Sequence, residues 1–453
     1  MTGTHFVGIG GAGMSGIAKI FLEKGYAVSG SDLAESDLTK TLEGMGARIT
    51  YGHSEDAVDG SAGMLVVSTA IPPCNPEVKK ARRLGIPVKQ RGSVLAELMD
   101  EKKGIAVAGA HGKTTTTSMI ALILENCGLD PAFLIGAKLE NLGTNGRWGA
   151  GEYMVAEADE SDGSFLFLNP WTTVVTNVED DHLDFYGSKE RLQKAFREFV
   201  LKTPATGKAV LCTDCQILNG LIPEFERQVD VCTYGIHHKA MLTARNLTLH
   251  TGGSRSEIWL RDRLLGTLEL KAPGEHNVSD ALAALAAGFA CGLDFESMAE
   301  VLAGFTGAKR RFELVGEKGG IRIYDDYAHH PTELRATIQA AKTLRAKRLV
   351  VVFQPHRYTR TKHFAEAFAD ALREAELLVM TSVYPAGEAP IPGVNAELIL
   401  KYVQPEENRE VLFEPDLDLI PELLAPRLKQ GDLVVVLGAG NVCRVGRKLY
   451  ETL

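Results

Sequence analysis

Residues 105–114 read IAVAGAHGKT, and the interpretation of the whole chain starts from them. An apolar run, residues 105–108, leads into a glycine turn and then into a helix-like segment, residues 115–126. A strand, a glycine-rich turn and a helix in this order gather backbone N–H groups and the positive helix end around one point, which suits the phosphates of a nucleotide. Lys113 would then reach the outer phosphates, and the Thr114 hydroxyl would bind Mg2+.

The phosphate loop is two residues shorter than the usual G-x-x-x-x-G-K-[ST] spacing, because Gly109 stands three residues before Gly112. A pattern this short arises by chance in some long chains, and the plain alternative is a glycine turn followed by an exposed lysine. The flanking strand and helix favour the phosphate site. The stretch therefore predicts an ATP-binding α/β domain, and the use made of the ATP is the question for the rest of the chain.

Length and composition bound the class of protein. At 453 residues, and about 150 residues per domain, we expect roughly three domains. The net charge of −9 argues against nucleic acid as a partner, because binding many phosphates requires a basic surface. We expect no signal peptide and no membrane insertion, since the N-terminus lacks a basic region followed by an apolar core and no apolar run approaches 18 residues. The seven scattered cysteines are typical of a reduced, cytoplasmic protein.

A second glycine-rich turn opens the chain. Gly8, Gly10 and Gly13 form a G-x-G-x-x-G pattern after a short strand, and Asp32 lies nineteen residues beyond Gly13. The glycines allow close backbone approach to a diphosphate, and the carboxylate suits a ribose. Alternating strand-like and helix-like segments as far as residue 99 predict a parallel sheet covered on both faces. Residues 100–104 are polar and read as a linker.

Acidic runs follow two strand-like segments after the phosphate loop. The first, residues 157–162, ends the segment 153–157, and the second, residues 179–184, follows the segment 172–177. The carboxyl ends of strands in a doubly wound sheet meet at one edge, so both runs should face the phosphate loop. A charge run by itself is usually a solvated loop. Two such runs beside a phosphate loop predict magnesium ligands.

The last third of the chain predicts another α/β unit. Residues 234–271 alternate apolar and polar positions around Gly252-Gly253 and read as antiparallel hairpins. Asn277 then either caps the following helix or meets a base. Strands are expected from residue 321 and at 348–353, 377–380 and 432–437. The loops after them carry five basic residues that can hold a carboxylate or phosphate: His329, His330, His356, Arg357 and Arg360.

The ordered motifs together resemble the Mur ligases of bacterial peptidoglycan synthesis, most of all the branch that adds L-alanine. They run through the chain as GIGGAGMSGIA at 8–18, HGKTTTTSM at 111–119, EADESDGSF at 157–165, TNVEDDHLDFYG at 176–187, GEHNVSDALAA at 274–284, KRRF at 309–312, DDYAHHPTE at 325–333, FQPHRYTRT at 353–361 and VYPAGE at 383–388. An ordered set of this length is highly specific.

The resemblance implies an α/β protein of three domains. They are a Rossmann-like UDP-sugar domain at 1–102, a central P-loop ATPase-like domain with a mixed sheet at 103–307, and a Rossmann-like amino-acid domain at 308–453. It also implies the substrates UDP-N-acetylmuramate, L-alanine and ATP, with Mg2+, and an ATP-dependent amide ligase that forms an acyl phosphate. The expected state is a cytoplasmic monomer or homodimer.

Residue roles follow from the matching motif positions. The UDP-sugar contacts implied are Gly10, Gly11, Ala12, Gly13, Met14, Ser15, Ser31, Asp32 and Ser68. The ATP contacts implied are Ala110, His111, Gly112, Lys113, Thr114, Thr115, His276, Asn277, Arg310 and Asp325. Magnesium would be held by Thr114, Glu157 and His182, the amino acid by Tyr327, His329, Arg357 and Arg360, and catalysis would rest on Lys113, Glu157, His182 and Arg310.

Two departures from the family pattern concern the central domain. Position 110 is Ala where many relatives have Thr, which matters little if the loop contributes only its backbone there. No lysine matches the carbamylated lysine of the ligases that add later residues, which favours the alanine-adding branch. The alternatives that remain are a sister ligase adding another amino acid or a preformed tripeptide, an NAD-dependent oxidoreductase suggested by the first glycine turn, and a regulatory nucleotide-binding protein.

Overall fold

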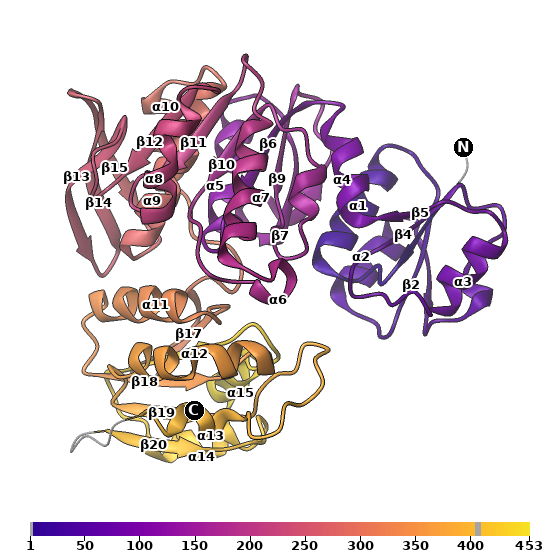
Figure 1. The fold of residues 1–453 in the computed structure, drawn as a ribbon. Coiled ribbons are helices and arrows are strands. Elements are labelled where there is room, and N and C mark those ends of the chain that lie inside the picture. The colour runs from indigo at the N-terminus through magenta and orange to yellow at the C-terminus, as the bar shows by residue number, and fades with distance from the viewer. Residues whose placement is uncertain (1–2, 404–408) are drawn as a thin grey trace. The chain divides into compact units, whose positions relative to one another are not determined.

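The computed structural model describes residues 3–403 and 409–453, and within them the chain forms three β-sheets whose strands are connected by helices and loops. Figure 1 shows the elements in chain order. By contacts the chain divides into two compact units. Unit 1 comprises 1–246, 256–268 and 279–305, and unit 2 comprises 247–255, 269–278 and 306–453. No helix in the described part of the chain is long and apolar enough to cross a membrane.

The first sheet is parallel, with the strand order β3-β2-β1-β4-β5 of half a doubly wound fold. Its strands are β1 (Thr4–Val7), β2 (Val28–Asp32), β3 (Arg48–Tyr51), β4 (Met64–Val67) and β5 (Val88–Gln90). The intervening helices are α1 (Ala12–Glu23), α2 (Asp37–Gly44), η1 (Glu55–Ala57), α3 (Pro76–Arg83) and α4 (Arg91–Met99). The Rossmann-like prediction for this part of the chain is confirmed.

The central sheet is mixed and follows the order β15-β14-β13-β12-β11-β10-β6-β9-β7-β8. Its strands are β6 (Lys103–Ala108), β7 (Ala132–Leu139), β8 (Thr144–Arg147), β9 (Tyr153–Glu157), β10 (Thr172–Val175), β11 (Lys208–Cys212), β12 (Val231–Gly235), β13 (Leu242–His250), β14 (Gly253–Leu260) and β15 (Arg263–Leu270). Its helical segments are α5 (Lys113–Asn126), η2 (Glu140–Leu142), η3 (Ser164–Phe167), α6 (Leu183–Tyr186), α7 (Lys189–Leu201), α8 (Gln216–Phe225), α9 (Glu275–Ala290) and α10 (Phe295–Ala303).

The third sheet has the order β16-β17-β21-β18-β19-β20 and is parallel except for the antiparallel edge pair β16 and β17. Its strands are β16 (Glu313–Lys318), β17 (Ile321–Asp326), β18 (Arg348–Phe353), β19 (Leu377–Met380), β20 (Glu410–Phe413) and β21 (Asp432–Leu437). Its helical segments are α11 (Pro331–Thr343), α12 (Tyr358–Ala371), α13 (Ala396–Leu400), α14 (Ile420–Leu424), η4 (Ala425–Arg427) and α15 (Cys443–Thr452).

Buried apolar strands explain why the parallel parts of these sheets form. In β18, Val351 and Phe353 pack into one core cluster while Val350 and Val352 pack into another. Successive side chains of a strand point to opposite faces, so a strand covered on both faces needs an apolar residue at every position. The predicted strands at 348–353, 377–380 and 432–437 match the observed bounds, and their residues are apolar except Arg348 and Asp432 at the first positions.

Two local predictions need correction. The polar linker is shorter than expected, because Lys103 and Gly104 already belong to β6 and pair with Tyr153 and Met154 of β9. Asn277 does not cap α9, since that helix begins at Glu275. The Asn277 side-chain amide instead donates a 2.7 Å hydrogen bond to the Pro273 carbonyl. The predicted hairpins are confirmed as β13, β14 and β15.

Candidate functional site

The phosphate loop joins β6 to α5 through two glycines in left-handed backbone conformations. Gly109 has φ +139°, and a Cβ there would lie 2.1 Å from the Thr176 hydroxyl. Gly112 has φ +80°, and a Cβ there would lie 2.4 Å from the Asp280 carboxylate. Side chains at these positions would clash and strain the backbone, so the turn requires glycine at both. The helix begins directly afterwards, at Lys113.

Neighbouring strands brace this loop from both sides, as the sequence predicted. The strand β6 lies between β10 and β9, so both acidic runs follow strands next to it. After β10, the Asn177 side chain accepts a 2.9 Å hydrogen bond from the backbone N–H of His111 and donates a 3.0 Å bond to the His111 carbonyl. The His111 ring lies 3.3 Å from the Glu179 carboxylate. Asn177 was not among the predicted site residues.

Lys113 makes two close contacts inside the site. Its ammonium donates to the Gly109 carbonyl at 2.5 Å and to the Glu160 carboxylate at 2.7 Å. Burial acts to lower the pKa of Lys113, but Glu160, Asp159 and Glu157 together outweigh it and raise the pKa. The ammonium is therefore held in its charged form beside the phosphate loop, as a phosphate ligand requires.

Three acidic residues of one run have separate partners. Glu157, at the end of β9, accepts a 2.6 Å hydrogen bond from the backbone N–H of Gly136. Asp159 accepts a 3.0 Å bond from the Arg91 guanidinium. Glu160 is 2% exposed, and burial raises its pKa to about 7 even though Lys113 opposes the shift. Sequence analysis singled out Glu157 from this run as a magnesium ligand and gave Asp159 and Glu160 no separate roles.

His182 also lies close to the Glu160 carboxylate. The residue has φ +57° and precedes α6, and its Nε2 lies 3.7 Å from Glu160 Oε1 and 3.5 Å from Asp181 Oδ2. The structure thus brings His182 to the same carboxylate as Lys113. The second oxygen of Glu160, Oε2, is buried and has no hydrogen-bond partner within the described residues.

The donors predicted for magnesium suit that ion chemically. Mg2+ is usually held by one or two carboxylates together with substrate phosphates and water. Glu157 supplies a carboxylate at the end of β9, and Thr114 lies in the first turn of α5. The buried Glu160 Oε2 is a further carboxylate oxygen of the same acidic run that has no hydrogen-bond partner in the described residues. In the described part of the chain no three imidazole or carboxylate ligands that include both Glu157 and His182 converge within 4.8 Å.

The first glycine turn stands at the carboxyl end of β1. Asp32 Oδ2 accepts a 2.8 Å hydrogen bond from the Gly10 N–H, and its Oδ1 accepts one from Leu33, so this carboxylate braces the turn. The next residues, Gly11 to Ser15, form the start of α1, where Ser15 and Met14 are buried. Ser68 follows β4 at the same edge of the sheet. The predicted UDP-sugar residues therefore meet at one edge.

Ser31 differs from the rest of that set because its hydroxyl is fully buried. It donates to Glu77 at 2.7 Å, and the Glu77 carboxylate also contacts His5 and His53 at 2.7 Å each. In this arrangement the Ser31 side chain belongs to a buried polar cluster formed by Ser31, His5, His53 and Glu77. The sequence signal for this cluster was slight, because its members come from β1, β2, α3 and the loop after β3.

In unit 2, Arg310 is fixed by several contacts. Its backbone has φ +61°, its Nε donates to Asp325 at 3.1 Å, and its Nη2 donates to the Gly438 carbonyl at 2.6 Å. The guanidinium also lies 5.0 Å from the centre of the Tyr327 ring. Burial raises the pKa of Asp325, with Arg310 opposing. The predicted residues Arg310, Asp325 and Tyr327 therefore form one cluster.

An aromatic chain extends from this cluster along the same sheet edge. The Tyr327 and His329 rings lie 5.3 Å apart, those of His329 and His356 5.4 Å, and those of His356 and Tyr384 5.5 Å with nearly parallel planes. Arg357 follows, with φ +68° and its N–H bonded to the Tyr384 carbonyl at 2.8 Å. Arg360 is buried in the first turn of α12. Tyr384 was missed by the sequence prediction.

The predicted adenine contacts also belong to unit 2. His276 Nε2 lies 3.2 Å from the Asn277 amide. Burial lowers the pKa of His276 to about 4, helped by the charge of Arg311, so its imidazole is neutral near pH 7. The predicted ATP contacts are therefore divided, with Ala110 to Thr115 in unit 1 and the remainder in unit 2.

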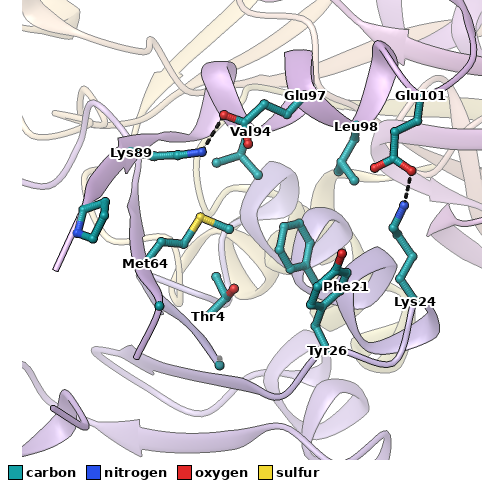
Figure 2. Close-up of a pocket in the computed structure, with 13 residues that line it drawn as sticks. Thr4, Phe21, Lys24, Tyr26, Met64, Lys89, Val94, Glu97, Leu98 and Glu101 are labelled. Atoms are coloured by element: carbon teal, nitrogen blue, oxygen red, sulfur yellow. Dashed lines mark hydrogen bonds and ion pairs between the residues drawn. The ribbon is translucent and has the colours of Figure 1, made fainter. Parts of the chain in front are cut away.

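A cavity of about 330 Å3 lies at the opposite edge of the first sheet, away from the glycine turn. It is lined at the amino ends of the strands by Thr4 and Met64, and by the aromatic rings of Phe21 and Tyr26. Figure 2 shows the ion pairs Lys89–Glu97 and Lys24–Glu101 at its border. No residue singled out by a motif lines this cavity.

Comparison with known sequences places the chain in one family along nearly its whole length. Family models match three consecutive segments: residues 3–103 match "Mur ligase family, catalytic domain", 107–288 match "Mur ligase middle domain" and 310–440 match "Mur ligase, glutamate ligase domain". The UDP-N-acetylmuramate–L-alanine ligase of Desulforamulus reducens is 49% identical over 451 residues, 99% of this chain and 97% of the relative. That of Pelotomaculum thermopropionicum is 47% identical over 99% of this chain and 97% of its own length.

Comparison with solved structures agrees with this assignment. The UDP-N-acetylmuramate–alanine ligase of Thermotoga maritima superposes with a TM-score of 0.86 at 29% identity, covering 100% of this chain and 99% of that one. A murein peptide ligase of Psychrobacter arcticus has a TM-score of 0.74 at 24% identity, over 100% of this chain and 98% of its own, and so shares the fold.

Proposed function

The chain belongs to the Mur ligase family, and we propose that it joins L-alanine to the lactyl carboxylate of UDP-N-acetylmuramate at the expense of ATP. The observation that carries this proposal is the 49% identity to an L-alanine ligase along almost the full length of both chains. The phosphate loop after β6, with the Lys113 ammonium beside it, supports the proposal that ATP binds there. The reaction supplies peptidoglycan precursors, and we propose a cytoplasmic location because ATP is a cosubstrate.

The chemistry takes two steps. The lactyl carboxylate attacks the γ-phosphorus of ATP, which gives an acyl phosphate and ADP. The amine of L-alanine then adds to the acyl carbon, and the tetrahedral intermediate expels phosphate to leave the amide. Both reactants of the first step are anions, so cationic groups must hold them together. Lys113 and Arg310 are the side chains we assign to that task.

Magnesium would be held by Thr114, Glu157 and His182, and would neutralise charge on the transferred phosphoryl group. In unit 2, Tyr327, His329, Arg357 and Arg360 form the pocket that we assign to L-alanine. A guanidinium suits the α-carboxylate of an amino acid, because its parallel N–H donors match the two carboxylate oxygens. Whether the protein acts as a monomer or a homodimer stays a prediction.

Phosphate release tests the proposal. The assay contains UDP-N-acetylmuramate, ATP and Mg2+, and compares L-alanine with D-glutamate and with the L-alanyl-γ-D-glutamyl-meso-diaminopimelate tripeptide. We expect release to depend on L-alanine. Release with the tripeptide alone would instead identify a sister ligase, and ATP binding without release would indicate a regulatory protein. A change in NAD(H) absorbance would favour the oxidoreductase.

A further inference from the structure

Arg91 lies where the first glycine turn meets the acidic run of the central sheet. It is the first residue of α4 and follows β5 directly, so it stands at the carboxyl edge of the first sheet with the glycine turn. A Cβ built on Gly13 would lie 2.7 Å from Arg91 Nη1 and 3.3 Å from its Cδ. The arginine side chain therefore lies flat against the first turn of α1, in space that only a glycine leaves open.

Asp159 fixes the direction of this arginine. The Arg91 Nη2 donates a 3.0 Å hydrogen bond to Asp159 Oδ2, and Asp159 Oδ1 accepts a 3.0 Å bond from the Ser161 N–H. One oxygen of the Asp159 carboxylate thus holds Arg91, while a backbone N–H fixes the other oxygen.

The remaining donors of Arg91 point to an anionic ligand. A guanidinium has five N–H donors, and within the described residues Asp159 is the hydrogen-bond partner of this side chain. The first N–H groups of α1 have no acceptor within the helix and favour negative charge. Gly10 and Gly11 do not add to them, because their N–H groups bond to Asp32 and to the Gly8 carbonyl. A fixed cation beside free helix N–H groups suits a diphosphate, whose oxygens accept from both.

We propose that Arg91 binds the diphosphate of UDP-N-acetylmuramate and that Asp159, although it belongs to the acidic run of the ATP-binding sheet, is the residue that positions Arg91. This inference rests on the proposed function for the identity of the nucleotide sugar. It assigns Asp159 to the sugar-nucleotide site, although Glu157, only two positions earlier in the sequence, is assigned to magnesium.

Calorimetric titration of the full-length protein without ATP tests the binding role. Arg91→Ala should weaken binding of UDP-N-acetylmuramate by roughly ten- to a hundredfold, the effect of losing a charge-assisted hydrogen bond. Binding of uridine, which has no phosphate, should not change. Arg91→Lys should recover part of the loss. Lys89→Ala is the matched control, because Lys89 lies two residues earlier and pairs with Glu97 at the surface.

The outcomes separate the two proposals. If wild-type protein does not bind UDP-N-acetylmuramate, the proposed function is wrong. If wild type binds and Arg91→Ala binds equally tightly, the role of Arg91 is wrong. If Arg91→Ala weakens the binding of uridine as much as that of UDP-N-acetylmuramate, the first sheet is misfolded in this variant. Arg91→Lys, which keeps the packing, would then bind both ligands as tightly as wild type, and that result would also overturn the role of Arg91.

A double-mutant cycle tests Asp159. Asp159→Asn should weaken UDP-N-acetylmuramate binding a few-fold in the wild-type background and have no further effect in the Arg91→Ala background, because it acts through Arg91. Its KM for UDP-N-acetylmuramate should rise more than its KM for ATP. Additive losses in the cycle, or a rise confined to the KM for ATP, would overturn the positioning role.

Discussion

Glu77 and Glu160 are both buried glutamates of unit 1, and their surroundings differ. Glu77 is 0% exposed, and its carboxylate contacts His5, His53 and Ser31, each at 2.7 Å. Glu160 is 2% exposed and has Lys113 at 2.7 Å, while its Oε2 has no hydrogen-bond partner in the described residues. Burial acts to raise both pKa values. The hydrogen bonds to Glu77 outweigh burial and lower its pKa, whereas the pKa of Glu160 rises to about 7.

The difference separates a structural carboxylate from a functional one. The side chains that contact the Glu77 carboxylate come from β1, β2 and the loop after β3, and none of them belongs to the phosphate loop. Glu160 shares its principal partner with the phosphate loop, and phosphates bound there would compete for the Lys113 ammonium. Incompletely satisfied buried polar groups in native proteins tend to mark functional sites. We therefore expect Glu77 to govern stability and Glu160 to govern the site.

Removing Lys113 should have the largest effect. Lys113→Ala loses a cation that faces the transferred phosphoryl group, and we expect acyl phosphate formation in a single turnover to fall by at least about a hundredfold. The thermal unfolding midpoint serves as the control for folding. Acyl phosphate formation at close to the wild-type rate would show that the pairing with Glu160 has no link to catalysis, and the contrast between the two glutamates would lose its basis.

The second largest effect concerns Glu160, which should differ from Glu77 in how it changes the stability of the protein with pH. Its pKa is raised in the folded state, so the folded protein binds more protons than the unfolded chain between about pH 4.3 and 7, and the glutamate destabilises increasingly as the pH rises. Glu160→Gln should therefore gain stability relative to wild type between pH 5 and pH 8, by up to about 3 kcal/mol. Denaturant unfolding at both pH values measures this. A constant difference would contradict the raised pKa.

The effect of Glu77 on stability should change with pH in the opposite direction to that of Glu160. Its pKa is lowered in the folded state, so its stabilisation is fully present above about pH 4.3, the unfolded value, and is lost as the pH falls through the folded pKa. Glu77→Gln should cost about 1.5–3 kcal/mol at pH 7, because charged hydrogen bonds to buried partners are lost. The deficit should shrink below pH 4. Glu97→Gln, at an exposed ion pair, is the control and should change stability by less than about 1 kcal/mol.

The smallest expected effect is that of Arg357 in unit 2 on the KM for L-alanine. The Arg357 side chain is 36% exposed, and its Nη1 lies 3.9 Å from Glu388. Solvent screens a group this exposed, so Arg357→Ala should raise the KM for L-alanine by about tenfold and leave UDP-N-acetylmuramate binding unchanged. Steady-state kinetics with each substrate varied in turn measures this. Equal weakening of both substrates would remove Arg357 from the amino-acid pocket.

The strands that the sequence predicted well are those buried on both faces. Apart from Arg348 and Asp432 at their first positions, β18, β19 and β21 consist of apolar residues, and the predicted bounds match those of the structure. The edge strands β3 and β20 were missed, because most of their residues are exposed and give no apolar run. Their pairing depends on the neighbouring strand, β2 or β19, which a local pattern does not reveal.

Much of the predicted site followed from local chemistry. The phosphate loop and the first glycine turn are recognisable because backbone N–H groups within a few residues form them, and only glycine permits their backbone angles. The buried Glu77 cluster, Arg91 and Tyr384 were not predicted. Each depends on side chains from distant segments, as with Glu77 and His5, which are 72 residues apart.

The loop IAVAGAHGKT predicted a site for a nucleotide phosphate, and the ordered motifs around it identified the family from the sequence alone. The tertiary structure alone decided how the carboxylates of one acidic run are used. Glu157 bonds to a backbone N–H 21 residues away, Asp159 to Arg91 at a separation of 68 residues, and Glu160 to Lys113 at a separation of 47. Neighbouring acidic residues look alike in sequence, and only the folded chain brings each one to a different partner.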